Sequence, residues 1–181
     1  MIGRCAVSSH AALKLIRSGY YDEALSVIRS LAEIANLLAL FAVDRTKFSE
    51  WKESQDATRQ KKFSAVKVRF ALEDGGHFIP IDKHRYAALS AYAIHAGPSN
   101  IPQAHDLDGR PIAFPKYQEA GLFLCINELG LTLAIITLFA PIVVELPVPV
   151  RKRLGRIAEK VINNVGGLNL DVKGRPWFKL H

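Results

Sequence analysis

The sequence of 181 residues is poor in cysteine, and neither Cys5 nor Cys125 belongs to a disulfide or metal-binding framework. Cys125 lies in the most apolar stretch, which favours a buried small hydrophobic side chain over a redox centre. The first residues lack a continuous apolar run, and His10 and Lys14 follow soon after, so no signal peptide is expected. A reducing cytoplasm is the simplest location.

Catalytic and structural motifs are also scarce. The sequence shows no internal repeat, no low-complexity segment and no convincing alternation of a β-strand. No Gly-x-Ser-x-Gly elbow surrounds Ser90, so a hydrolase triad is unsupported. His95, His105, Asp106 and Asp108 are acceptable metal ligands, but no His-Glu-x-x-His spacing is present. A solvated turn explains them more simply, and we expect neither a metal nor a cofactor.

What the sequence does contain is helical periodicity. Hydrophobic residues make up 49% and charged residues 23%, which is typical of a folded protein. The pattern predicts an all-α, single-domain bundle of five to six helices over residues 1–165, followed by a basic C-terminal tail over 166–181. The expected helices cover 7–18, 22–43, 57–73, 82–96, 117–140 and 150–164, with a short amphipathic turn or helix over 44–53.

Capping and breaking residues set the expected helix ends. Asp22 and Asp82 are predicted N-caps, because short acidic side chains accept hydrogen bonds from the first backbone amides. Pro141 should end the apolar helix, and Gly166 with Gly167 should end the last one.

Positive charge is concentrated in two segments. The formal net charge is +7, and residues 45–69 hold eight Lys and Arg against three acidic residues. Residues 151–181 hold eight against two and begin with Arg151, Lys152 and Arg153. Such segments favour nucleic acid or an acidic partner, while a solvated helix surface is the plainer alternative. No aromatic-interleaved RNA-binding signature accompanies them.

The apolar helices raise two questions, whether the chain enters a membrane and whether it associates with another protein. Residues 129–144 carry no charge, but a membrane span needs about 20 apolar residues, and Glu128 and Pro141 interrupt this run. We therefore expect a buried bundle helix and no membrane association. The wide apolar surfaces of helices 22–43 and 117–140 are hard to cover in one small bundle, which predicts a homodimer or a complex with another protein.

Polar groups inside two apolar helices form the candidate site. Arg29 and Glu33 lie four residues apart within helix 22–43 and are placed to pair, largely buried, with each other or with the later helix. Ser90 and His95 lie on that later helix, and His95 near its end also suits a cap on terminal carbonyls. These side chains are expected to form one polar pocket or to staple the two helices together.

The order of these residues resembles a known pattern. Arg17-Ser-Gly-Tyr-Tyr, Ala24-Leu, Arg29-Ser-Leu-x-Glu33 and then Tyr86-x-x-Leu-Ser90-x-Tyr-x-x-His95 is similar to an uncharacterised bacterial all-helical family related to HEPN-like proteins of phage defence and abortive infection. The resemblance covers residues 11–97. It implies a small, often dimeric helical bundle, in some members an RNA-cleaving toxin.

One departure from that family weakens the case for catalysis. HEPN ribonucleases have four to six residues between an Arg and the following His, whereas nine residues lie between Arg85 and His95. We therefore expect a nucleic-acid- or nucleotide-binding component, with Glu33, Ser90, Arg85 and the basic residues 151–153 in binding roles. The alternatives are a divergent metal-independent ribonuclease, with His95 as acid/base and Arg29 or Arg85 stabilising charge, and a structural subunit without ligand.

Overall fold

The computed structural model describes residues 1–93 and 114–172, and side chains over 1–91 and 114–165. Within these ranges every regular element is a helix, so the all-α prediction is confirmed, but eight helices are present where five to six were expected. The helices are α1 (Ile2–Arg17), α2 (Tyr21–Val43), α3 (Arg45–Glu53), α4 (Asp56–Lys62), α5 (Ala65–Asp74), α6 (Lys83–Ala93), α7 (Glu119–Val143) and α8 (Val148–Val172).

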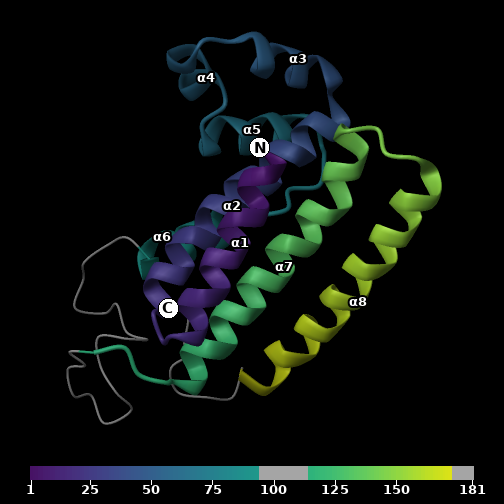
Figure 1. Ribbon diagram of the computed structural model, residues 1–181. Coiled ribbons are helices and arrows are strands. Elements are labelled where there is room, and N and C mark those ends of the chain that lie inside the picture. The colour runs from purple at the N-terminus through teal and green to yellow at the C-terminus, as the bar shows by residue number, and fades with distance from the viewer. Residues whose placement is uncertain (94–113, 173–181) are drawn as a thin grey trace.

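Helix α2 is the centre of the bundle. It packs against α1, α7, α6, α5 and α3, and half of its residues are buried (Figure 1). By length and composition α2 and α7 are each apolar enough to cross a membrane, with mean hydropathies of 1.6 and 2.1. The same composition suits a helix surrounded by other helices, because no side of such a helix needs polar residues.

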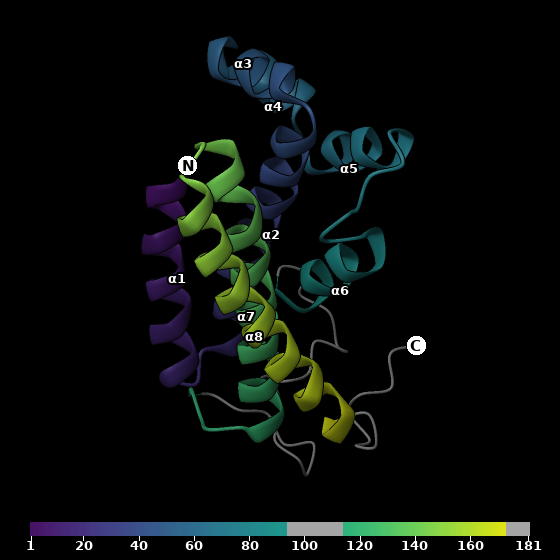
Figure 2. The ribbon, with the colours of Figure 1, turned by 90° about the vertical axis from the view of Figure 1, so that its right-hand side faces the viewer.

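Helices α7 and α8 form an antiparallel pair on one side of the bundle. Helix α8 packs chiefly on α7 and stands on the outside, as two perpendicular views agree (Figures 1 and 2). Gly130 lies at this contact, where an added Cβ would lie 3.0 Å from a methyl group of Val165. The missing side chain therefore allows α8 to approach α7 closely.

Helices α3, α4 and α5 lie together at one end of the bundle (Figure 1). Phe41 of α2 is fully buried there, with the rings of Phe48, Trp51 and Phe63 at centroid distances of 5.4, 5.8 and 6.1 Å. Phe63 is buried between α4 and α5, at the point where the predicted single helix 57–73 divides in two. The contact between Phe63 and the aromatic cluster explains the break. In one continuous helix the position of the Phe63 ring would be set by helical periodicity alone, whereas here it is set by packing on Phe41.

Other helix ends differ from the sequence-based expectations. Asp22 lies inside α2, whose N-cap is Tyr20 without a side-chain hydrogen bond, so the Asp22 cap was wrong. Asp82 is confirmed as a cap, because its Oδ1 accepts from the Arg85 amide at 2.8 Å. Pro141 lies within α7, which continues to Val143, and α8 continues through Gly166 and Gly167 to Val172. Pro141 is buried in the bundle, where the contacts of α7 with its neighbours offset the cost of a proline in the last turn.

A buried amide fixes the start of α6 against α2. Asn36 Nδ2 donates to the Ile81 carbonyl and Asn36 Oδ1 accepts from the Ile81 amide, each at 2.9 Å. Asn36 is 4% exposed and Ile81 fully buried. Both backbone groups of Ile81 therefore depend on one side chain, and that side chain sets the register between the two helices.

The cysteines are part of the core. Cys5 and Cys125 are both free and buried. Burial raises the pKa of each thiol, and for Cys125 the nearby carboxylates of Asp22 and Glu128 raise it further. The prediction that Cys125 is a buried small side chain is confirmed, since a thiol of this kind does not ionise near neutral pH.

Candidate functional site

The polar residues expected to converge do so on facing sides of α2 and α6. Arg29 Nε donates to Ser90 Oγ at 2.9 Å, and Arg29 Nη2 donates to the Tyr86 hydroxyl. That hydroxyl in turn donates to Glu33 Oε1 at 2.8 Å, while Arg29 and Glu33 form an ion pair at 3.4 Å. We call Arg29, Glu33, Tyr86 and Ser90 the α2–α6 cluster.

The α2–α6 cluster also contains a stacked contact and a helix bond. The Arg29 guanidinium carbon lies 4.6 Å from the centre of the Tyr86 ring, and Ser90 Oγ donates to the Tyr86 carbonyl at 2.8 Å. Every nitrogen of the guanidinium thus has a partner within the protein. Its positive charge is compensated by Glu33 and by the face of the Tyr86 ring, which reduces the charge that it presents to an outside anion.

Arg29 and Glu33 pair with each other and with α6 as expected, and their side chains are partly rather than completely buried. The side chains of Arg29 and Glu33 are 23% and 38% exposed. The cluster lies at the rim of the α2–α6 contact, because α6 covers only part of the α2 surface there. Removing one member therefore costs less than the 3–5 kcal/mol typical of a fully buried pair.

Tyr86 is the member of the cluster with a perturbed ionisation. Its pKa is raised, first by burial and then by the hydrogen bond to Glu33, and Arg29 opposes this rise. A phenol that keeps its proton above the usual range remains a hydrogen-bond donor to Glu33 at physiological pH. The neutral Tyr86 hydroxyl therefore bridges the two charged groups, accepting from Arg29 and donating to Glu33.

Arg85 does not join the α2–α6 cluster. Its Nε and Nη2 both contact Glu128 Oε2 of α7, at 2.8 and 2.6 Å, and each side chain is 19% exposed. This contact ties α6 to α7 and neutralises Arg85. The expected binding role of Arg85 is not supported by this geometry, since its charge is already paired.

His95, the expected catalytic residue, lies outside the described residues, and so do His105, Asp106 and Asp108. Within the ranges that the structure describes, no group of three His, Cys, Asp or Glu side chains converges as metal ligands do. Of the expected site residues, Arg29, Glu33 and Ser90 come together, and with Tyr86 they form one hydrogen-bonded network.

The basic residues of α8 present the opposite situation. Arg151, Lys152 and Arg153 are exposed, as are Arg156 and Lys160. At 100° per residue Lys152, Arg153, Arg156 and Lys160 lie on the side of the helix opposite the buried Ala158 and Val165 that pack toward α7. Arg151 is exposed in the first turn, in line with Ala158 two turns further on. None of the five has an ion-pair partner among the described side chains. We call this surface the α8 basic face.

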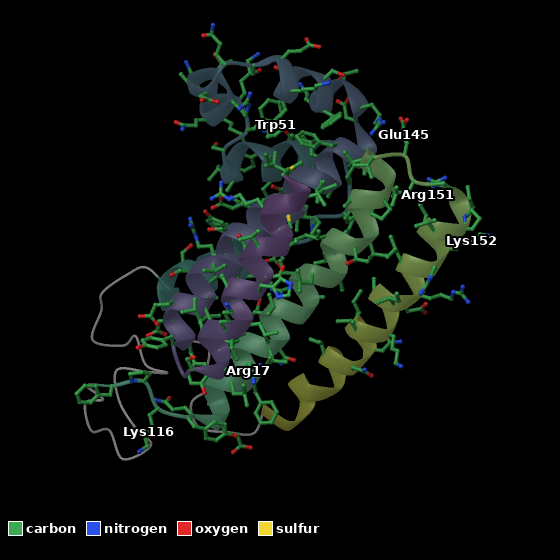
Figure 3. The ribbon with its side chains drawn as sticks, in the orientation of Figure 1. Arg17, Trp51, Lys116, Glu145, Arg151 and Lys152 are labelled. Carbon is green, nitrogen blue, oxygen red and sulfur yellow. The ribbon has the colours of Figure 1, made fainter. Side chains whose placement is uncertain are left out.

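The α8 basic face lies at the same end of the bundle as α3. Arg45 at the start of α3 donates to the Val143 carbonyl at the end of α7 and pairs with Glu145 in the α7–α8 turn. Figure 3 shows Arg151, Lys152 and Glu145 at this end together with Trp51, whereas Arg17 and Lys116 lie at the opposite end. The structure thus joins two positively charged segments that are about a hundred residues apart in sequence.

Part of the positive charge of α3–α5 is compensated locally. Lys47 and Lys62 both bind Glu50, at 3.0 and 2.6 Å, and Arg59 pairs with Asp56 at 2.8 Å. The two lysines lower the pKa of Glu50. Three exposed lysines remain without an ion pair in the described part of this segment, namely Lys52, Lys61 and Lys67.

Sequence reasoning missed two features of these sites. Tyr86 was named only as part of the residue pattern, and its hydroxyl is the centre of the α2–α6 cluster. Glu128 was noted only as a charge that limits the apolar run, and it is the partner of Arg85. A carboxylate in the most apolar helix is a usable signal, because an internal acid requires a cation nearby.

Comparisons of the chain with models of known protein families, with curated proteins and with solved structures gave no match. Function is therefore inferred from the residues and their geometry alone.

Proposed function

We propose that this protein binds the phosphate backbone of nucleic acid through the α8 basic face and the neighbouring cations of α3–α5. The carrying observation is the group of five exposed cations on α8 that have no ion pair among the described side chains, four of them on its outer side, at the end where the second basic segment also lies. Between Val148 and Lys160 the helix holds these five cations against a single acid, Glu159. Phosphate contacts of this kind give salt-dependent binding with little sequence preference.

The state of the other arginines supports binding over catalysis. A phosphoryl-transfer site needs cations whose donors are free to meet charge that develops on phosphate. Arg29 contacts Ser90, Tyr86 and Glu33, and Arg85 is paired with Glu128, so each of these charges already has a carboxylate partner. The α2–α6 cluster therefore acts in this proposal as a structural element, and the ribonuclease alternative would depend on His95.

The proposal is tested by fluorescence anisotropy with a labelled 20-nucleotide RNA and a DNA duplex at several salt concentrations. Replacing Arg151 and Lys152 by Gln should weaken binding about 10- to 50-fold near 0.1 M salt and lower the salt slope by about two. The matched control replaces Lys14 and Lys116 by Gln, which removes the same charge at the opposite end of the bundle. That control should bind within about twofold of the parent.

Three outcomes would contradict the proposal. Parent protein that shows no salt-dependent binding to RNA or DNA removes it altogether. Equal loss in the two double variants would mean that net charge matters and the α8 basic face does not. Cleavage of the RNA by the parent, abolished in His95→Ala, would establish the ribonuclease alternative.

A second candidate is self-association, in which the chain serves as a structural subunit. The observation that favours it is a group of exposed apolar side chains near the α7–α8 turn, namely Leu138, Ile142, Val144, Val148 and Val150. We propose a homodimer through this group. Sedimentation equilibrium at high micromolar concentration should show a dimer that Ile142→Glu dissociates and Val7→Glu, an exposed site on α1, does not. A strict monomer would remove this candidate.

Within this proposal the described helices form one folding unit and the protein works in the cytoplasm. The HEPN-like relationship remains part of the proposal, supported by the convergence of Arg29, Glu33 and Ser90, three residues of the pattern that suggested it.

A further inference from the structure

A hollow of about 340 Å³ lies at the corner where α1 turns into α2. Its apolar walls are Ile16, Leu122 and the rings of Tyr21 and Tyr117, and its polar groups are those of the Arg17–Ser18 turn. We call it the corner hollow. Its volume falls within the range of about 300–1,000 Å³ that is usual for small-molecule pockets. It lies at the end of the bundle opposite the α8 basic face (Figure 3).

The backbone around the corner hollow is held in place by close contacts. Gly19 has a φ of +78°, and a Cβ there would lie 3.0 Å from the Lys116 carbonyl oxygen. The backbone N–H of Gln118 donates to the Tyr21 hydroxyl oxygen at 3.2 Å. At Gly121 an added Cβ would lie 2.5 Å from the Tyr21 ring. The wall formed by Tyr21 and residues 116–118 is thus built from the bundle itself, and the hollow is shaped before any ligand enters.

The charge at the corner hollow is positive. Arg17 is exposed and has no ion pair or hydrogen bond among the described side chains, in contrast to Arg29 and Arg85. Ser18 adds an exposed hydroxyl beside it. Helix α2 begins at Tyr21 without a side-chain cap, and Asp22 and Glu23 do not line the hollow. A free guanidinium at the mouth of an apolar hollow suits a ligand that is anionic at one end and apolar at the other.

We propose that the corner hollow binds a small aromatic anion, a carboxylate or a phosphate monoester. The Arg17 guanidinium forms a charge-assisted, two-point contact with the anion, and Ser18 adds a hydroxyl donor. The aromatic ring packs against Leu122 and meets Tyr117, whose side chain is 68% exposed and forms the rim, while the buried Tyr21 supports the wall from behind. Aromatic rings favour offset or edge-to-face contacts with such side chains.

The test is an NMR titration of ¹⁵N-labelled protein with four probes. Phenyl phosphate and benzoate carry both the ring and an anion, inorganic phosphate carries the anion alone, and benzyl alcohol carries the ring alone. The first two should shift the Gly19 and Gln118 amides saturably, with affinities at least about tenfold above those of the last two. The tighter of phenyl phosphate and benzoate identifies the anion that the site prefers.

Two charge variants separate the corner hollow from general anion binding. Arg17→Gln should weaken binding of the better probe about tenfold or more, because it removes the charged donor. Lys116→Gln should leave affinity unchanged, since Lys116 lends only its backbone to the corner. The proposal is overturned if neither aromatic anion saturates below about 10 mM. It is equally overturned if shifts are confined to α8, or if the two variants behave alike.

Discussion

Arg29 and Arg85 on the inner helices and Arg151 with its neighbours on α8 carry the same charge but have different capacities to bind. The inner arginines are enclosed by carboxylates, a phenol and a hydroxyl, whereas the α8 cations face solvent without an ion pair in the described structure. A guanidinium whose charge is paired with a carboxylate contributes to packing and orientation, and one without such a partner is available to phosphate. Formal charge counted along a sequence does not distinguish the two.

The largest expected effect comes from weakening the contact between α2 and α6, the two helices that carry Arg29 and its partners. Asn36→Ala should lower the free energy of unfolding by about 3 kcal/mol, because it leaves the buried amide and carbonyl of Ile81 without partners. Chemical denaturation measures this change. Asn163→Ala on the exposed side of α8 is the control and should change stability by less than about 0.5 kcal/mol. A loss below about 1 kcal/mol for Asn36→Ala would show that Asn36 does not fix α6.

The next effect tests the comparison itself. Arg85→Ala should destabilise the protein by about 2–3 kcal/mol, because Glu128 would keep its charge in a site only 19% exposed. It should leave nucleic-acid affinity unchanged. Lys152→Ala should do the reverse, with little effect on unfolding and weaker binding at low salt. If Arg85→Ala weakens binding as much as Lys152→Ala, the division into paired and available cations fails.

The smallest effect is a change in alkaline stability. The pKa of Tyr86 is raised in the folded protein, so above the unfolded value of about 10 the native phenol keeps a proton that the unfolded chain has lost. Stability therefore falls as pH rises through this window. Between about pH 9 and 11 the melting temperature should fall more steeply with pH for the parent than for Tyr86→Phe. Tyr117→Phe, on an exposed ring, should match the parent, and equal slopes in all three would refute the assignment.

Helical periodicity was enough to predict the all-α class and the meeting of Arg29, Glu33 and Ser90. Polar groups within apolar helices need partners, and these partners come from a facing helix that carries polar residues at the same level along its axis. The Arg85–Glu128 pair was not predicted, because no local pattern links residues 43 positions apart.

The division of 57–73 into α4 and α5 was not predicted either. It depends on Phe63 meeting the ring of Phe41, and that contact is fixed by tertiary packing. The same holds for Pro141, which was expected to end a helix that α2 and α8 hold together for two further residues.

The attachment of α8 to the bundle through α7 has a consequence for motion. A helix with one principal neighbour can separate and exchange its amide hydrogens without unfolding the remainder, whereas α2, enclosed on several sides, opens only with the whole bundle. Exchange protection should therefore decrease from α2 through α7 to α8. A bound polyanion that spans α8 and α3 would act as a second attachment and slow exchange in α8 most, so recognition would also regulate the local stability of the helix that performs it.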